Sequence, residues 1–251
     1  MKKRSILMIT GLALIFAAAC STESEEIDEF EVLSEYMVDN NLDLTDLLAD
    51  GTWITTASAV FDGGVENYFI VDLRGSDKKP ANGTVDFEDG HIPGANLVTL
   101  GNVLTYVQTN NTSELPVVVV CYSGQTAGHA VAALKLSDIP AKVLKWGMSS
   151  WNSKFDVWSG NTGSVAVGSA GWDETDDVPT LPSNTTPTLD TGHDDGADIL
   201  ADRVQAMLDG GFKSKAGADV LTDYASYNVI NFWAVTDWEL YGHVKEAYQV
   251  T

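Results

Sequence analysis

The sequence has few basic residues and only two cysteines. Lys and Arg total 14 against 36 Asp and Glu, so the 251-residue chain carries a formal net charge of −22. A surface this acidic repels nucleic acid phosphate and anionic lipid, which argues against DNA or RNA as a partner. The apolar content of 44% and aromatic content of 9% exclude a wholly disordered chain, and the length suits one large domain or two small ones.

The apolar run at the N-terminus is too short for a usual membrane-spanning helix. Ile6 to Ala19 follows a basic start at Lys2 to Arg4 and ends in three alanines. A basic start, a short apolar run and small residues are the layout of a secretory signal peptide. We therefore expect residues 1–19 to direct export and to be removed.

The residue after the alanines is Cys20, and this boundary resembles the cleavage site of bacterial lipoproteins. Ala17 departs from that pattern, because a leucine is usual three residues before the cysteine. The resemblance implies cleavage before Cys20, acylation of its thiol and a tether over residues 20–26. We then expect the mature chain to be lipid-anchored to a bacterial cell membrane, on its periplasmic or cell-surface side. The alternative is an ordinary signal peptide cleaved nearby, which also exports the chain.

Cys121 is the second cysteine. If Cys20 carries lipid, no internal disulfide can form, and Cys121 is a lone thiol in an oxidising compartment. A lone thiol is either a small buried apolar residue or a reactive group, so its neighbours decide between the two interpretations.

Short apolar segments alternate with helical patterns between residues 27 and 155. Tyr68–Leu73 and the four valines Val117–Val120 are predicted strands, and Gln125–Leu136 has the apolar spacing of an amphipathic helix. Four consecutive valines indicate a central parallel strand covered on both faces, and the alternation predicts an α/β fold. Further helices or helical turns are expected at 27–37, 42–49, 102–109 and 147–152, and further strands at Leu97–Val98 and Val143–Leu144.

Residues 156–196 are acidic and rich in Gly, Ser and Thr. No sustained period runs through them, so they are predicted to be a long loop or linker. An amphipathic helix is expected from near Ala197, with Leu200, Val204 and Leu208 on one face.

Residues 197–251 echo an earlier part of the chain. Asp50–Gly51 stands 22 residues before Asp72, and Asp209–Gly210 stands 22 residues before Asn231. We interpret this segment as a degenerate partial repeat, which predicts a smaller C-terminal α/β segment.

The repeat extends through two further stretches. FIVDLR at 69–74 aligns with NVINFW at 228–233 without a gap, so Asn231 and Trp233 align with Asp72 and Arg74. After a gap, GHIPGANLVT at 90–99 aligns with GHVKEAYQVT at 242–251. No counterpart of Val117–Trp151 follows, and we expect the second copy to lack an active-site cysteine.

Cys121 lies between the four valines and a glycine-containing turn that opens the next helix. Parallel α/β proteins place their sites at this carboxyl edge of the sheet. The segment CYSGQTA can curl so that backbone N–H groups point inward, and the positive end of the following helix adds to them. Such donors stabilise a thiolate or a bound anion, and the thiolate is the nucleophilic form of cysteine.

Three ordered motifs resemble the rhodanese family of sulfurtransferases. IVDLRG at 70–75 is similar to the family's strand-ending Asp-x-Arg, and GHIPGA at 90–95 is similar to its signature loop. CYSGQTA at 121–127 resembles its active-site loop, and KWGMSSW at 145–151 follows where the family has a glycine and a tryptophan. The resemblance implies a rhodanese-like three-layer sandwich with a central parallel sheet over residues 27–155, including an N-terminal helical extension.

The resemblance implies a sulfurtransferase that needs no cofactor. Cys121 would take sulfane sulfur from a donor of the thiosulfate or polysulfide type, become a persulfide, and pass the sulfur to a thiol, a protein or another nucleophile. Asp72 and Arg74 are implied to be a charge pair that fixes the strand end beside the loop, and His91 to hydrogen-bond within its own loop. The loop residues implied to bind substrate are Tyr122, Ser123, Gly124, Gln125, Thr126 and Ala127.

One position departs from the family pattern, because Thr126 stands where many members carry an arginine. Capture of a dianion such as thiosulfate is then less assured on so acidic a chain. Cysteine phosphatases of similar fold use Cys-x5-Arg, and the arginine would fall at Ala127, so phosphatase activity is not expected. The alternative that stays open is a non-catalytic module, acting as persulfide carrier or as redox-sensing or binding domain.

Acidic residues also crowd at the end of the predicted linker. Their order does not match the Asp-x-Asp-x-Asp-Gly calcium loop, and a solvated acidic segment is the simpler interpretation. No metal site is therefore expected at Asp190, His193, Asp194, Asp195 and Asp198.

Overall fold

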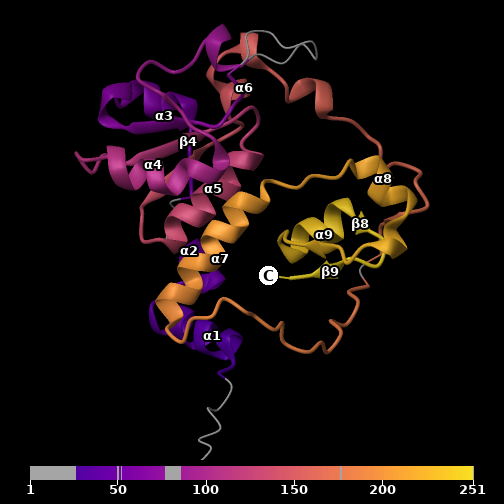
Figure 1. The fold of residues 1–251 in the computed structure, drawn as a ribbon. Helices are drawn as coiled ribbons and strands as arrows, with labels where there is room; N and C mark the ends of the chain where they lie inside the picture. Colours follow the sequence, from indigo (N-terminus) through magenta and orange to yellow (C-terminus); the bar gives the residue numbers. More distant parts are fainter. Residues whose placement is uncertain (1–26, 50, 52, 77–85, 176, 251) are drawn as a thin grey trace, which may run out of the picture.

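The computed structural model describes residues 27–49, 51, 53–76, 86–175 and 177–250 (Figure 1). The predicted signal peptide, Cys20 and the tether lie outside these residues. Among the helices of the described ranges, none combines the length and the apolar character needed to cross a membrane.

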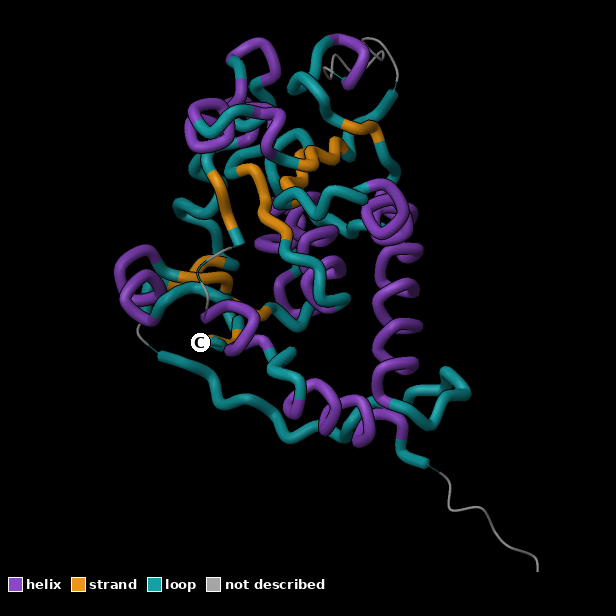
Figure 2. Tube along the Cα trace, turned by 90° about the vertical axis from the view of Figure 1, so that its left-hand side faces the viewer, coloured by secondary structure: helices purple, strands orange, loops and turns teal. Residues whose placement is uncertain are grey.

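A five-stranded parallel sheet forms the centre of the larger part of the molecule, with the strand order β1-β5-β4-β2-β3 (Figures 1 and 2). In the central pairing, Phe69 lies opposite Val117 and Asp72 opposite Val120. The four valines are thus the central strand that the sequence predicts. The strands are β1 (Ile54–Thr55), β2 (Phe69–Asp72), β3 (Asn96–Leu97), β4 (Val117–Val120) and β5 (Ala141–Leu144).

The valines of β4 point alternately into two apolar cores. Val117 and Val119 belong to one core, Val118 and Val120 to the other, and none is more than 2% exposed. A strand with both faces buried and both edges paired has no position for a polar side chain, which explains the uninterrupted β-branched run.

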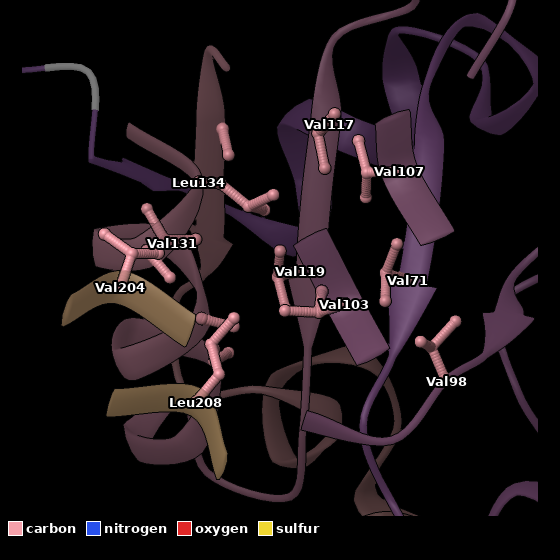
Figure 3. Packing of buried hydrophobic residues seen from close by; sticks show 14 of the residues in the cluster. Val71, Val98, Val103, Val107, Val117, Val119, Val131, Leu134, Val204 and Leu208 are labelled. Atoms are coloured by element: carbon pink, nitrogen blue, oxygen red, sulfur yellow. The ribbon is translucent and has the colours of Figure 1, made fainter. Parts of the chain in front are cut away.

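Helices cover both faces of the sheet and complete the predicted three-layer arrangement. One core takes Val60 and Met148 from two short helices, α3 (Ala57–Asp62) and α6 (Met148–Trp151). The other core is built by longer helices, and Figure 3 shows several of its valines and leucines packed together. These helices are α4 (Val103–Asn110) and α5 (Gln125–Leu136), with α1 (Glu29–Asp39) and α7 (Gly196–Gly210) packed outside them.

The N-terminal extension is helical, as predicted. α1 begins after Asp28, whose carboxylate accepts hydrogen bonds from Phe30 N at 3.0 Å and Glu31 N at 3.2 Å. This is the usual N-cap arrangement, which satisfies backbone donors that a helix start leaves free. A second short helix, α2 (Leu44–Ala49), leads to β1.

Several observed boundaries differ from the predicted ones by one or two residues. The predicted strand Leu97–Val98 is observed as β3 (Asn96–Leu97), and β5 begins at Ala141, two residues before the predicted Val143. Both differences have one cause. Strand ends are set by pairing with a neighbour, whereas the polar Asn96 and Lys142 interrupt the apolar pattern on which the prediction rests.

α7 belongs to the core of the larger unit. It lies along α1 and α5 (Figure 1), and Leu200, Val204 and Leu208 join the core that contains Val119. The predicted apolar face of this helix is confirmed. The boundary drawn from the sequence after residue 196, however, separates the helix from the elements on which it packs.

The remaining C-terminal residues form a smaller α/β unit (Figure 1). It contains the helices α8 (Gly217–Thr222) and α9 (Val235–Tyr241). β7 (Ile230–Asn231) pairs in parallel with β9 (Tyr248–Gln249), and β8 (His243–Val244) pairs antiparallel with β6 (Trp172–Asp173). β6 lies inside the segment 156–196 predicted as loop or linker, so that segment also supplies a strand.

Glu29 fastens α1 to the segment that leads into α7. Its buried carboxylate accepts hydrogen bonds from Thr191 N at 2.7 Å, Thr191 Oγ1 at 2.8 Å and Gly192 N at 2.8 Å. The bond from Thr191 N and the two others hold the pKa of Glu29 below its ordinary value, against the opposite effect of burial.

We expect Glu29→Gln to destabilise the protein at neutral pH, and the difference from wild type to shrink in acid. Because the folded-state pKa of Glu29 is lowered, the carboxylate contributes stability above its unfolded-state pKa, and this contribution is lost as the pH falls through the folded-state value. Urea unfolding of both proteins over a series of decreasing pH values measures the difference in their free energies of unfolding. Glu31→Gln, on the exposed side of the same helix, is the control and should stay near wild type. A destabilisation by Glu29→Gln that is independent of pH contradicts the prediction.

Candidate active site around Cys121

Cys121 follows the last residue of β4, at the carboxyl edge of the sheet. The residue is 3% exposed and its thiol is free. Gly124 N donates a hydrogen bond to Cys121 Sγ over 3.1 Å. The sulfur therefore lies at the boundary between the apolar core and a main-chain donor.

The loop after Cys121 turns directly into α5. Gly124 precedes the helix with φ of +98°, a left-handed conformation that glycine adopts without steric cost. The backbone N–H groups of Ser123, Gln125 and Thr126 have no hydrogen-bond partner in the described part of the chain. Free N–H groups at the start of a twelve-residue helix form an environment that favours negative charge.

A second turn, in the KWGMSSW motif, packs directly against this loop. Met148 N donates to Cys121 O over 2.9 Å, and Ser149 Oγ donates to Tyr122 O over 3.0 Å. The carbonyl oxygens of Cys121 and Tyr122 are thus hydrogen-bonded by the neighbouring turn. Gly147 makes the approach possible, because a Cβ on this residue would lie 2.3 Å from Cys121 O.

Tyr122 ties the loop to the end of β2. Its hydroxyl accepts a hydrogen bond from Gly75 N at 3.1 Å and donates a short one to the buried carboxylate of Asp86. Burial, and then the hydrogen bond to Asp86, raise the pKa of Tyr122 to about 12. The motif CYSGQTA places Tyr122 in the predicted substrate-binding loop, whereas Asp86 stands alone after a polar stretch and belongs to no motif.

Asp72 and Arg74 form the expected charge pair. Both are buried, and Arg74 Nη2 lies 2.8 Å from Asp72 Oδ2 while Arg74 Nε donates to Asp72 Oδ1 over 3.0 Å. Arg74 Nη2 also donates to Gly90 O over 2.8 Å, and the guanidinium lies over the ring of Phe155. A guanidinium bonded in several directions is held rigidly, so the pair links the strand end to the loop that carries GHIPGA.

His91 is exposed and keeps to its own loop, as the sequence analysis expects. Its ring stacks on Phe87 with 3.8 Å between the ring centroids, and Nδ1 donates to Phe87 O over 3.1 Å.

The remaining loop residues differ in their exposure. Gln125 is exposed, Thr126 is half-buried and Ala127 is fully buried. Beside them, the rings of Trp146 and Trp158 pack at a tilt, with 4.5 Å between their centroids. No role is predicted for Trp158 from the sequence, because it falls in the predicted linker.

The acidic residues near the end of the linker have structural partners. Asp195 caps α7 by accepting a hydrogen bond from Ala197 N at 2.9 Å, and His193 lies 3.1 Å from Asp202. Over the described ranges, no group of three or more His, Cys, Asp or Glu side chains is placed to hold a metal ion.

Comparison with known proteins gives one family match and several similar folds. The profile of the rhodanese-like domain matches residues 57–154. A rhodanese-like domain protein from Staphylococcus aureus is 21% identical, covering 40% of this chain and 91% of that chain with a TM-score of 0.32. A rhodanese-related protein from Thermoplasma volcanium is 16% identical, covering 39% and 89% with a TM-score of 0.30. No curated protein matches the sequence significantly.

Gly147→Ala tests the contact between the second turn and the loop. We expect at least about a tenfold loss of any reaction at Cys121, the equivalent of about 1.4 kcal/mol, because the added Cβ must displace the loop backbone. The φ of +55° at Gly147 adds strain. Gly128→Ala is the control, since a Cβ at Gly128 in α5 meets no atom within 4 Å. Equal rates of sulfur transfer or of thiol alkylation in the two variants would contradict this account.

Proposed function

We propose that the rhodanese-like domain at residues 57–154 makes this chain a sulfurtransferase whose nucleophile is Cys121. The family match supports a role in sulfur transfer or persulfide chemistry. The finer assignment depends on one observation above all. The only thiol in the described residues lies at the start of α5 with Gly124 N donating to it, and further main-chain donors of the same loop are free.

The reaction has two displacement steps. After the thiol proton has left, the Cys121 thiolate attacks the sulfane sulfur of the donor. A new S–S bond forms while the donor's bond to that sulfur breaks, and the leaving group (sulfite from thiosulfate, a shorter polysulfide from a polysulfide) takes the electron pair. An acceptor thiolate then attacks the terminal sulfur of the Cys121 persulfide, which restores the Cys121 thiolate and yields a persulfide on the acceptor.

The backbone N–H groups of the loop explain how the intermediate is stabilised. The terminal sulfur of a persulfide is negative at neutral pH, and N–H groups fixed by the fold stabilise such a charge without proton transfer. The free N–H groups of Ser123, Gln125 and Thr126 are the candidates for this role. No side chain from Cys121 to Ala127 carries a positive charge, so the loop itself attracts an anion only through its dipoles.

The donor follows from the same electrostatics. Thr126 provides no counter-charge for a sulfonate, and the chain as a whole has a net charge of −22. A dianion such as thiosulfate approaches against this field, whereas a singly charged donor, such as a hydropolysulfide (HSn⁻) or an organic persulfide (R–S–S⁻), meets less repulsion. We therefore propose a donor of the polysulfide type, with a thiol as acceptor.

We also propose that the chain is exported and held at a bacterial membrane by lipid on Cys20, so that the sulfur chemistry takes place outside the cytoplasm. The support is the sequence of the first twenty residues alone. The intact mass of the protein purified from membranes tests this. We expect cleavage before Cys20 and the added mass of acyl chains, and a mass corresponding to an unmodified cysteine would refute the anchor.

A persulfide carrier is the second candidate. Cys121 is 3% exposed, so a bulky protein acceptor has little access to the sulfur while a small donor can still load it. A carrier would hold the persulfide without rapid turnover.

Assays of wild type and Cys121→Ser distinguish a catalytic sulfurtransferase from a persulfide carrier. We expect wild type to transfer sulfur from polysulfide to a small thiol faster than from thiosulfate, and Cys121→Ser to reach only the uncatalysed rate. Mass spectrometry after polysulfide treatment should show 32 Da added at Cys121, about the mass of one sulfur atom, as the covalent step requires. Persulfide formation without turnover would indicate the carrier. Equal rates for the two proteins and no persulfide would eliminate both candidates.

A further inference from the structure

The smaller C-terminal unit repeats the strand pairing of one half of the rhodanese-like domain. β2 pairs in parallel with β3, and β7 pairs in parallel with β9. The register is the same in both copies. Val71 lies opposite Asn96, and Ile230, which the sequence alignment places at Val71, lies opposite Tyr248, which it places at Asn96.

Hydrogen bonds outside the ladders repeat as well. Val98 N donates to Asp72 O over 3.0 Å, and Val250 N donates to Asn231 O over 3.0 Å. Before the strand, Tyr68 N donates to the carbonyl three residues earlier, as Tyr227 N does. The C-terminal unit is therefore a backbone copy of the segment that contains α3, β2 and β3.

The two copies differ at the second edge of the strand, which is the edge of β2 away from β3 and the edge of β7 away from β9. In the domain, β4 occupies that edge of β2, with Phe69 N donating to Pro116 O over 3.0 Å and Leu73 N donating to Val120 O over 2.8 Å. The matching residues of the second copy are Asn228 and Phe232. In the ranges that the structure describes, no strand lies beside β7 on this side.

The side chains along this edge are apolar and exposed. Ile230 is 64% exposed and Phe232 is 51% exposed, whereas Val71, the counterpart of Ile230, is fully buried. A row of free backbone groups beside large apolar side chains is a template for pairing with another strand.

We propose that this edge of β7, from Asn228 to Phe232, is a docking site for an extended apolar segment of a different protein, which adds as a parallel strand. The domain itself shows what covers this edge, since Val117–Val120 holds the equivalent place beside β2. The expected occupant is thus a run of about four β-branched residues, bound through main-chain hydrogen bonds with side chains that cover Ile230 and Phe232.

The charge of the chain argues that the occupant is not a second copy. Each copy carries a net charge of −22, so two copies repel each other before the edges meet. A segment flanked by lysine or arginine is attracted by the same field.

A peptide with the sequence of residues 115–120, LPVVVV, between flanking lysines is the probe. In the domain, residues 116, 118 and 120 bond to β2, so N-methyl groups on the second and fourth valine of the peptide block pairing with β7. N-methyl groups on the first and third valine leave that edge free. With the full chain, we expect the first modification to weaken binding at least about tenfold, the equivalent of about 1.4 kcal/mol, and the second to change it little.

Ile230→Lys, with Ile54→Lys as control, locates the site on the protein. Ile54 is 56% exposed and lies on β1, the edge strand at one end of the large sheet, so both variants add the same charge to an exposed edge isoleucine. We expect only Ile230→Lys to weaken binding of the labelled peptide, measured by fluorescence anisotropy. Equal effects of both variants, or of both N-methylated peptides on wild type, would overturn the proposal. So would a wild-type dimer in sedimentation experiments that Ile230→Lys dissociates, because a second copy would then be the occupant.

Discussion

The burial of β4 on both faces and along both edges is the constraint on which the rest of the structure depends. Its valines divide between two cores, and its neighbours β2 and β5 hold it in register. A strand fixed on both faces and both edges holds the next residue, Cys121, at a defined position at the edge of the sheet. The contacts of the candidate site depend on this position.

Rigid attachment continues from the strand into the loop. Carbonyl groups of the loop are bound by the turn at Gly147, while Tyr122 is held by Asp86 and the end of β2 by the buried pair of Asp72 and Arg74. With the carbonyls of Cys121 and Tyr122 occupied, the N–H groups of Ser123, Gln125 and Thr126 stay free in the loop. The site therefore favours anions through its backbone, even though the molecule as a whole is strongly acidic.

The parts of the structure that the sequence predicts are those with a local cause. Four consecutive β-branched valines favour a buried strand, and CYSGQTA has its glycine where the chain turns into α5, so the centre of the fold and the loop are recognisable in the sequence. The hydrogen bond between Tyr122 and Asp86 and the contact between the Trp146 and Trp158 rings join residues that are not neighbours in sequence, and a periodic sequence pattern does not predict such pairs. For the same reason the amphipathic pattern of α7 gives its apolar face but not the neighbour that covers it.

The path of the chain between the two units has a topological consequence. β6 pairs with β8 in the smaller unit, α7 then returns to the core beside α5, and the chain leaves again for α8. The two units are interleaved rather than strung in series. Excising residues 57–154 would strip α7 from the core that contains Val119. Truncation after Gly210 would remove α8, α9 and β7–β9 but leave β6 behind without its partner β8.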